Sequence, residues 1–244
     1  MVIFNRKIAA LLSALLFLAL PARAHAMHIA DGVISLPWAG LWYVLSAPFI
    51  AAGLVRLKKS AREGKNIKPL LGLVGAAVFV MSCMPVPVPT AGTSSHITGT
   101  ALAAVVAGPL YAALVSASAL LLQALLLSDG GLTTWGANIF SMGVAGSFAG
   151  YFIYKGLARL GAPVFAAAFM AGMLGDWSVY AVTSAQLALA LHGPGEFMRL
   201  FLTVLAGFAP TQVPLGILEG IVTAVAVKFL HARRPELFCA PYPE

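Results

Sequence analysis

The sequence contains little charge and almost no cysteine. Charged residues make up 9% of its 244 residues, and hydrophobic residues make up 60%. A typical soluble domain carries roughly a quarter charged residues, so a water-facing surface cannot be built here. The composition therefore excludes most classes of soluble enzyme and indicates a multi-pass membrane protein. The two cysteines, Cys83 and Cys239, lie in an apolar segment and in the tail, which excludes a disulfide framework.

Motifs of ATP hydrolysis and zinc proteolysis are also missing. The chain has no G-x-x-x-x-G-K-[ST] P-loop and no H-E-x-x-H motif, so it is not expected to hydrolyse ATP by the P-loop mechanism or to have the commonest zinc-peptidase arrangement. Its net charge of +7 does not indicate nucleic-acid binding, because basic residues of membrane proteins gather in cytoplasmic loops. We expect contact with membrane lipids and none with nucleic acid.

Residues 1–26 have the pattern of a secretory signal peptide. Two basic residues precede the apolar run Ile8–Leu20, which is too short for a spanning helix of about 20 residues. The A-x-A cleavage pattern Ala24-His25-Ala26 follows. Cleavage there leaves residues 27–244 as one integral membrane domain that begins with Met27; an uncleaved anchor is the alternative.

The remaining apolar runs predict an all-α fold, a polytopic membrane helix bundle of about seven transmembrane segments. The alternating prolines of 85–89 remove backbone donors and predict an extended stretch. The predicted helical segments are 36–57, 69–85, 97–107, 109–127, 132–154, 163–191 and 198–230.

Charge parity sets the predicted topology in the bacterial cytoplasmic (inner) membrane. The basic loop 56–68 is predicted to be cytoplasmic. A break at Gly108-Pro109 lets residues 97–127 cross twice and puts the later basic residues on that same side. The mature N-terminus is then outside and the C-terminus cytoplasmic. Segment 97–107 covers only about 17 Å, so we expect a short or partly re-entrant helix buried in protein.

Few polar side chains within the apolar segments can carry chemistry. Charge at membrane depth is costly, so Asp176 and Glu219 are functional candidates, although hydrogen bonds to neighbouring helices would explain them equally well. His192 and His231 fit ordinary surface positions. His28 and His96 both fall on the predicted outer side.

His28 becomes the second residue of the processed chain, and this position suggests a metal site. The α-amino group of Met27, with the backbone nitrogen and imidazole of His28, can close two fused chelate rings on one ion. His96 can supply a fourth nitrogen. Four nitrogens in a plane suit Ni(II), Cu(II) or low-spin Co(II) better than zinc. Satisfied or exposed histidines are the alternative, and the amine is available only after cleavage.

Four sequence blocks resemble the CbiM/NikM family, the metal-binding membrane subunits of energy-coupling-factor cobalt and nickel transporters. The blocks cover nearly all of the mature chain in the family's order. They are Met27-His28-Ile29-Ala30-Asp31-Gly32-Val33, Gly92 to Thr100 with His96, Gln123 to Thr134 followed by Gly136-Ala137-Asn138, and Pro214 to Gly220 with Glu219. The family's usual histidine before the last block appears here as Gln212 or Val213, which puts any role of that position in doubt.

The resemblance implies a subunit that captures Co(II) or Ni(II) outside the cell and needs no other cofactor. It implies partners, namely a second membrane subunit and two ATPase subunits, and leaves open a small auxiliary membrane subunit. The family's ligands correspond to Met27, His28 and His96, and Asp129 and Asn138 could orient them. Two rival hypotheses are a proton-coupled secondary transporter that uses Asp176 and Glu219, and a membrane-embedded metalloenzyme that uses both histidines.

Overall fold

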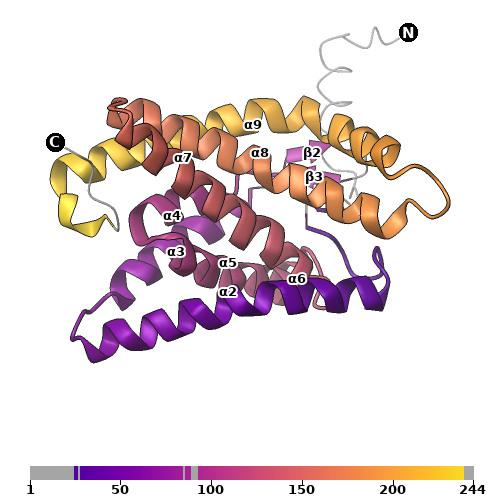
Figure 1. Cartoon of the computed structure of the whole chain (residues 1–244), viewed down its shortest axis with the longest axis horizontal. Coiled ribbons are helices and arrows are strands. Elements are labelled where there is room, and N and C mark those ends of the chain that lie inside the picture. The colour runs from indigo at the N-terminus through magenta and orange to yellow at the C-terminus, as the bar shows by residue number, and fades with distance from the viewer. Residues whose placement is uncertain (1–24, 27, 85, 89–92, 239–244) are drawn as a thin grey trace, which may run out of the picture.

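The computed structural model describes residues 25–26, 28–84, 86–88 and 93–238. Residues 1–24 of the predicted signal peptide, and Met27, lie outside the described residues. The described chain is a helix bundle with one small sheet (Figure 1), which confirms the predicted polytopic helical fold. Its helices are α2 (Leu36–Arg62), α3 (Lys68–Ser82), α4 (Thr100–Ala107), α5 (Pro109–Leu122), η1 (Gln123–Leu127), α6 (Trp135–Asn138), η2 (Ile139–Gly146), α7 (Ser147–Arg159), α8 (Val164–Leu191), α9 (Phe197–Arg233) and the short 3-10 turn η3 (Pro235–Leu237).

Several helices have the length and composition of membrane spans. Four of them, Leu36–Arg62, Pro109–Leu127, Val164–Leu191 and Phe197–Arg233, are long and apolar enough to cross a bilayer, and the 15-residue α3 is shorter. Large apolar side chains stay exposed on the outside of the bundle, as in Val44, Leu73 and Phe229. Such a surface fits lipid tails and not water.

The predicted break at Gly108-Pro109 is confirmed. Gly108 has a φ of +97°, a backbone conformation that suits glycine, and Pro109 opens α5. The helix before the break is shorter than predicted, because α4 begins at Thr100 and has 8 residues. At 1.5 Å per residue it spans about 12 Å, and all but one of its residues are buried. It is a short helix enclosed by protein, as polar backbone ends at membrane depth require.

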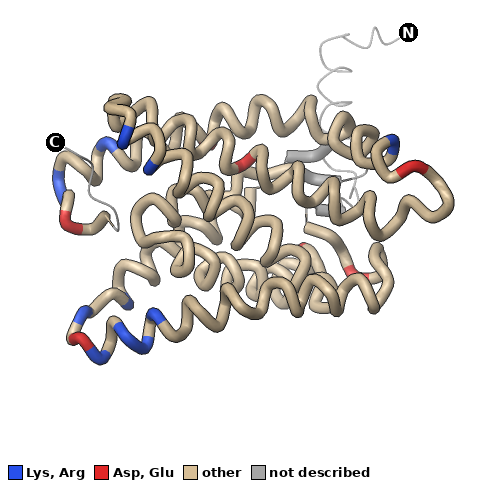
Figure 2. The backbone as a smooth tube through the Cα atoms, in the orientation of Figure 1, with Lys and Arg blue, Asp and Glu red and all other residues tan. Residues whose placement is uncertain are grey.

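The first basic segment is helical for most of its length, which corrects the predicted loop 56–68. Helix α2 continues to Arg62, and Lys59 and Arg62 occupy its last turn. Cations there interact favourably with the helix dipole, which explains why the helix does not end with the apolar run. Figure 2 shows that Lys and Arg gather at one end of the bundle, at the close of α2, α7 and α9.

The small sheet lies in the half of the bundle away from these basic helix ends (Figure 1). Strand β3 (Thr93–Ser95) is central; β1 (His25–Ala26) pairs with it in parallel and β2 (Val86–Val88) pairs antiparallel. The extended β2 confirms the prediction from the alternating prolines. The sheet brings the chain before Met27 and the chain before His96 side by side, because His25 is in register with Thr93.

Glycines bring the inner helices into close contact. A Cβ atom on Gly150 of α7 would lie 2.6 Å from the Ala101 Cβ of α4, and one on Gly175 of α8 would lie 2.9 Å from the same atom. A Cβ atom on Gly172 of α8 would lie 2.9 Å from the carbonyl oxygen of Glu219 on α9, so the two helices touch through their backbones. Small residues at helix interfaces permit this spacing in membrane proteins.

Candidate metal centre

The structure brings His28 and His96 together. Their ring centroids are 4.9 Å apart, and both residues are buried, at 3% and 0% exposure. His28 follows β1, and His96 follows β3 directly. With Asp129, which lies in the loop after η1, they offer three candidate ligand atoms that all lie within 4.8 Å of one another. This is the kind of cluster that can hold a metal ion.

Each imidazole keeps one nitrogen available. His96 Nδ1 lies 2.9 Å from the carbonyl oxygen of Ile97 and donates to it, which leaves the lone pair on Nε2. Neither Nε2 atom, of His28 or of His96, has a hydrogen-bond partner among the described residues. Burial, with a smaller contribution from His28, lowers the pKa of His96 to about 4. The His96 ring is therefore neutral near pH 7, as a metal ligand must be.

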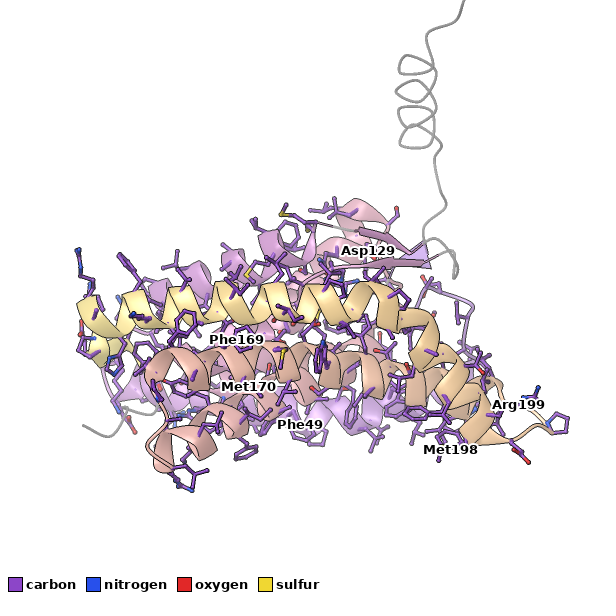
Figure 3. The ribbon with its side chains drawn as sticks, turned by 90° about the horizontal axis from the view of Figure 1, so that it is seen from above. Phe49, Asp129, Phe169, Met170, Met198 and Arg199 are labelled. Carbon is purple, nitrogen blue, oxygen red and sulfur yellow. The ribbon has the colours of Figure 1, made fainter. Side chains whose placement is uncertain are left out.

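Asp129 forms a hydrogen bond with the second ring nitrogen of His28. Its Oδ1 lies 3.2 Å from His28 Nδ1. Burial raises the pKa of Asp129, but the hydrogen bond with His28 and the nearby imidazoles outweigh burial, and the pKa lies below its usual value. Asp129 is thus a carboxylate that can orient the ring or act as a ligand itself. Figure 3 shows Asp129 beside the strands at this end of the molecule.

Asn138, at the end of α6, fixes the backbone next to His28. Its Oδ1 accepts from the Ile29 amide at 2.8 Å, and its Nδ2 donates to the Ile29 carbonyl at 3.1 Å. Thr134 also donates to this carbonyl. One side-chain amide thereby pairs with both backbone groups of the residue after His28, as a neighbouring β-strand would.

Glycines let the loop after η1 approach the N-terminal segment. Gly130 has a φ of +81°, and a Cβ on it would lie 3.0 Å from His28 Cβ. A Cβ on Gly131 would lie 2.2 Å from Asp31 Oδ1. In the space that these glycines leave, the Asp31 carboxylate accepts hydrogen bonds from Leu132 and Thr133. These bonds attach the N-terminal segment to the loop.

Glu219 and Asp176 are both fully buried, but they lie outside the group of candidate ligands. Glu219 accepts from the Thr98 hydroxyl and from the Thr98 and Gly99 amides, so it holds the turn that follows His96. Asp176 lies close enough to Glu219 for the two carboxyl groups to interact.

Sequence reasoning gives no role to two residues of the site, and one position departs from the family pattern. Asp31 lies in the first matched block, which alone could have pointed to it. Tyr180 on α8, which bonds to the His96 backbone, lies outside every matched block. The family's usual histidine before the last block corresponds here to Gln212 or Val213. Gln212 is buried and Val213 is exposed, so Gln212 is the one that faces inward.

The chain matches the family model described as CbiM, the cobalt uptake substrate-specific transmembrane region, over residues 28–237. The chain belongs to this family. It is 52% identical over 214 residues to the cobalt transport protein CbiM of Geobacter sulfurreducens, an alignment that covers 88% of this chain and 62% of that one. It is 51% identical over 211 residues to CbiM of Sorangium cellulosum, covering 86% and 94% of the two chains. The chain thus spans less than two thirds of the Geobacter relative and nearly all of the Sorangium one.

A solved structure has the same fold. A crystal structure of a truncated transition metal transporter superimposes with a TM-score of 0.74 at 26% identity, covering 84% of this chain and 98% of that one. The CbiM chain is therefore a cobalt transport component with several membrane-length helices, and its family is a transporter family and not an enzyme family.

Proposed function

We propose that this CbiM chain is the substrate-specific component of an ATP-driven energy-coupling-factor importer for Co(II) or Ni(II). The ion binds at the outer end of the bundle through the amine of Met27, the backbone nitrogen and imidazole of His28, and Nε2 of His96. The observation that carries this proposal is the convergence of two buried imidazoles, each with an unpartnered nitrogen, at the segment that cleavage would turn into an N-terminus.

The charge distribution supports the proposed orientation. The basic ends of α2, α7 and α9 lie at one end of the bundle, and the small sheet, whose strands precede both histidines, lies in the other half (Figures 1 and 2). The positive-inside rule assigns such an end to the cytoplasm. ATPase subunits would meet the chain there, together with a second membrane subunit and, where present, a small auxiliary one. The chain has no P-loop, so ATP hydrolysis falls to these partners.

A shift of the N-terminus by one residue tests the amine as a ligand. The processed protein is purified, its first residue is determined by sequencing, and Co(II) and Ni(II) binding is measured by calorimetry and visible absorption. A second form carries one extra alanine before Met27. We expect the processed form to bind one ion with a planar four-nitrogen spectrum and the extended form to lose both. An unchanged complement and spectrum in the extended form would refute the amine chelate.

The ATP-driven mechanism has a separate test. The purified chain is placed in ATP-free vesicles with a pH gradient, and uptake of radioactive cobalt is followed. We expect binding without accumulation until the partner subunits and ATP are added. Accumulation by the chain alone that is lost in Asp176→Asn would establish a proton-coupled secondary transporter instead.

A further inference from the structure

Tyr180 holds the backbone of His96, and Glu219 holds the turn that follows it. The Tyr180 hydroxyl donates to the His96 carbonyl at 3.1 Å and accepts from the His96 amide at 3.4 Å. Two residues later, the Glu219 carboxylate accepts from the Thr98 hydroxyl at 2.8 Å and from the Gly99 amide at 2.9 Å. Both backbone groups of His96 and the turn after it are thus bonded to side chains of α8 and α9.

The two helices that carry these side chains form a tightly packed pair. A Cβ on Gly220 of α9 would lie 2.8 Å from the Phe169 carbonyl oxygen of α8, and Figure 3 shows Phe169 between the two helices. The Trp177 indole donates to the Gln212 carbonyl across the same interface at 3.0 Å. Tyr180 and Glu219 are therefore fixed relative to each other, so the His96 backbone, which bonds to Tyr180, is held in a fixed relation to the turn at Thr98 and Gly99, which bonds to Glu219.

The position of this backbone has a particular consequence for metal choice. In the proposed chelate, the N-terminal residues fill three corners of a plane, and only His96 determines whether the fourth donor lies in that plane. Ni(II) gains from a planar set of nitrogens, whereas Zn(II) prefers a tetrahedral one. A His96 that could move out of the plane would lower the preference for nickel over zinc.

We propose that Tyr180 and Glu219 are specificity-determining positioning residues, which keep His96 Nε2 in the metal plane and so disfavour Zn(II). This inference rests on the proposed function, because it takes the N-terminal chelate as given. It concerns the choice of ion and not the coupling to ATP.

Tyr180→Phe is the variant that tests the proposal, because it removes one hydroxyl and keeps the ring that packs edge-on against Phe208. Its matched control is Tyr111→Phe, which removes the hydroxyl of another buried tyrosine, one that bonds to Ser60 near the basic end of α2. Glu219→Gln is the second variant. Each processed protein is titrated with Ni(II) and with Zn(II), and the visible band of bound Ni(II) is recorded.

Loss of residues that orient a metal ligand typically weakens binding about 10-fold to 100-fold. We expect Tyr180→Phe to lower Ni(II) affinity by about 10-fold with little change for Zn(II), and to shift the Ni(II) band. Glu219→Gln should do the same more strongly, and Tyr111→Phe should do neither. An unchanged ratio of Ni(II) to Zn(II) affinity in Tyr180→Phe overturns the proposal, even if both affinities fall together. Failure of the parent protein itself to bind Ni(II) would instead refute the proposed function.

Discussion

Gly131 is the position where a single added methyl group should do most damage to the site without removing any candidate ligand. A Cβ there would lie 2.2 Å from Asp31 Oδ1 and 2.6 Å from the Asp31 backbone nitrogen. The second distance matters more, because a backbone atom cannot rotate away as a carboxylate can. Gly131→Ala must therefore push the N-terminal segment off the loop and weaken the hydrogen bonds from Asp31 to Leu132 and Thr133.

The cost can be worked out from this geometry. Overpacking typically costs about 1–3 kcal/mol. The hydrogen bonds of Asp31 are exposed to solvent, so their loss adds only about 1 kcal/mol in total. A net cost of about 3 kcal/mol, carried wholly by the metal-binding conformation, corresponds to a loss of about 100-fold in Co(II) affinity at 1.4 kcal/mol per tenfold.

Calorimetric titration of the processed protein with Co(II) measures this loss, and thermal unfolding in detergent separates it from a general loss of stability. Gly40→Ala is the matched control, because a Cβ on Gly40 in α2 meets nothing within 4 Å. That substitution should leave Co(II) affinity unchanged. Equal affinity in Gly131→Ala and Gly40→Ala would show that close contact between the loop and the N-terminal segment is not needed for binding.

Three further predictions test other parts of the molecule. Asn138→Ala leaves the Ile29 amide without its side-chain partner and the Ile29 carbonyl with Thr134 alone, and we expect Co(II) affinity to fall by about 10-fold in the same titration; full affinity would mean that Asn138 does not position His28. Gly150→Val forces α7 away from α4 and should lower the free energy of unfolding by about 1–3 kcal/mol, whereas Gly156→Val, with open space around it, should cost far less; equal unfolding midpoints would contradict the close packing. His192→Ala should not change metal binding, because this ring bonds to the end of its own helix and packs against Phe197, and reduced binding would reveal a ligand outside the proposed set.

Most of the fold could be predicted from the sequence, because membrane helices are encoded by apolar length and charge. Charge parity required a break at Gly108-Pro109, and α4 and α5 meet there. The boundaries were less predictable. The start of α4 at Thr100 depends on Glu219, which is 120 residues away along the chain from Gly99. The continuation of α2 to Arg62 depends on helix-end electrostatics, which hydrophobicity alone does not reveal.

Some residues of the candidate metal site could likewise be predicted from the sequence, and others could not. His28 and His96 could be selected because metal chelation depends on residue type and on distance from the N-terminus. Tyr180 could not be selected, since a tyrosine in an apolar helix has the same sequence pattern whether its hydroxyl bonds to a neighbouring helix or to the backbone of a candidate ligand. The sequence marks Glu219 as a functional candidate, because a charged side chain at membrane depth is energetically costly. Only the packed structure shows that its carboxylate holds the turn after His96.

The complete burial of His96 has a kinetic consequence. An ion cannot reach Nε2, or leave it, by ordinary exchange with surface water, because the ring is fully buried and the His28 ring lies against it. Entry and exit then require the residues that cover the His96 ring to move, and the rate of that movement limits how fast metal exchanges. An ion bound to Nε2 would stay in place between such movements, whatever the free concentration outside.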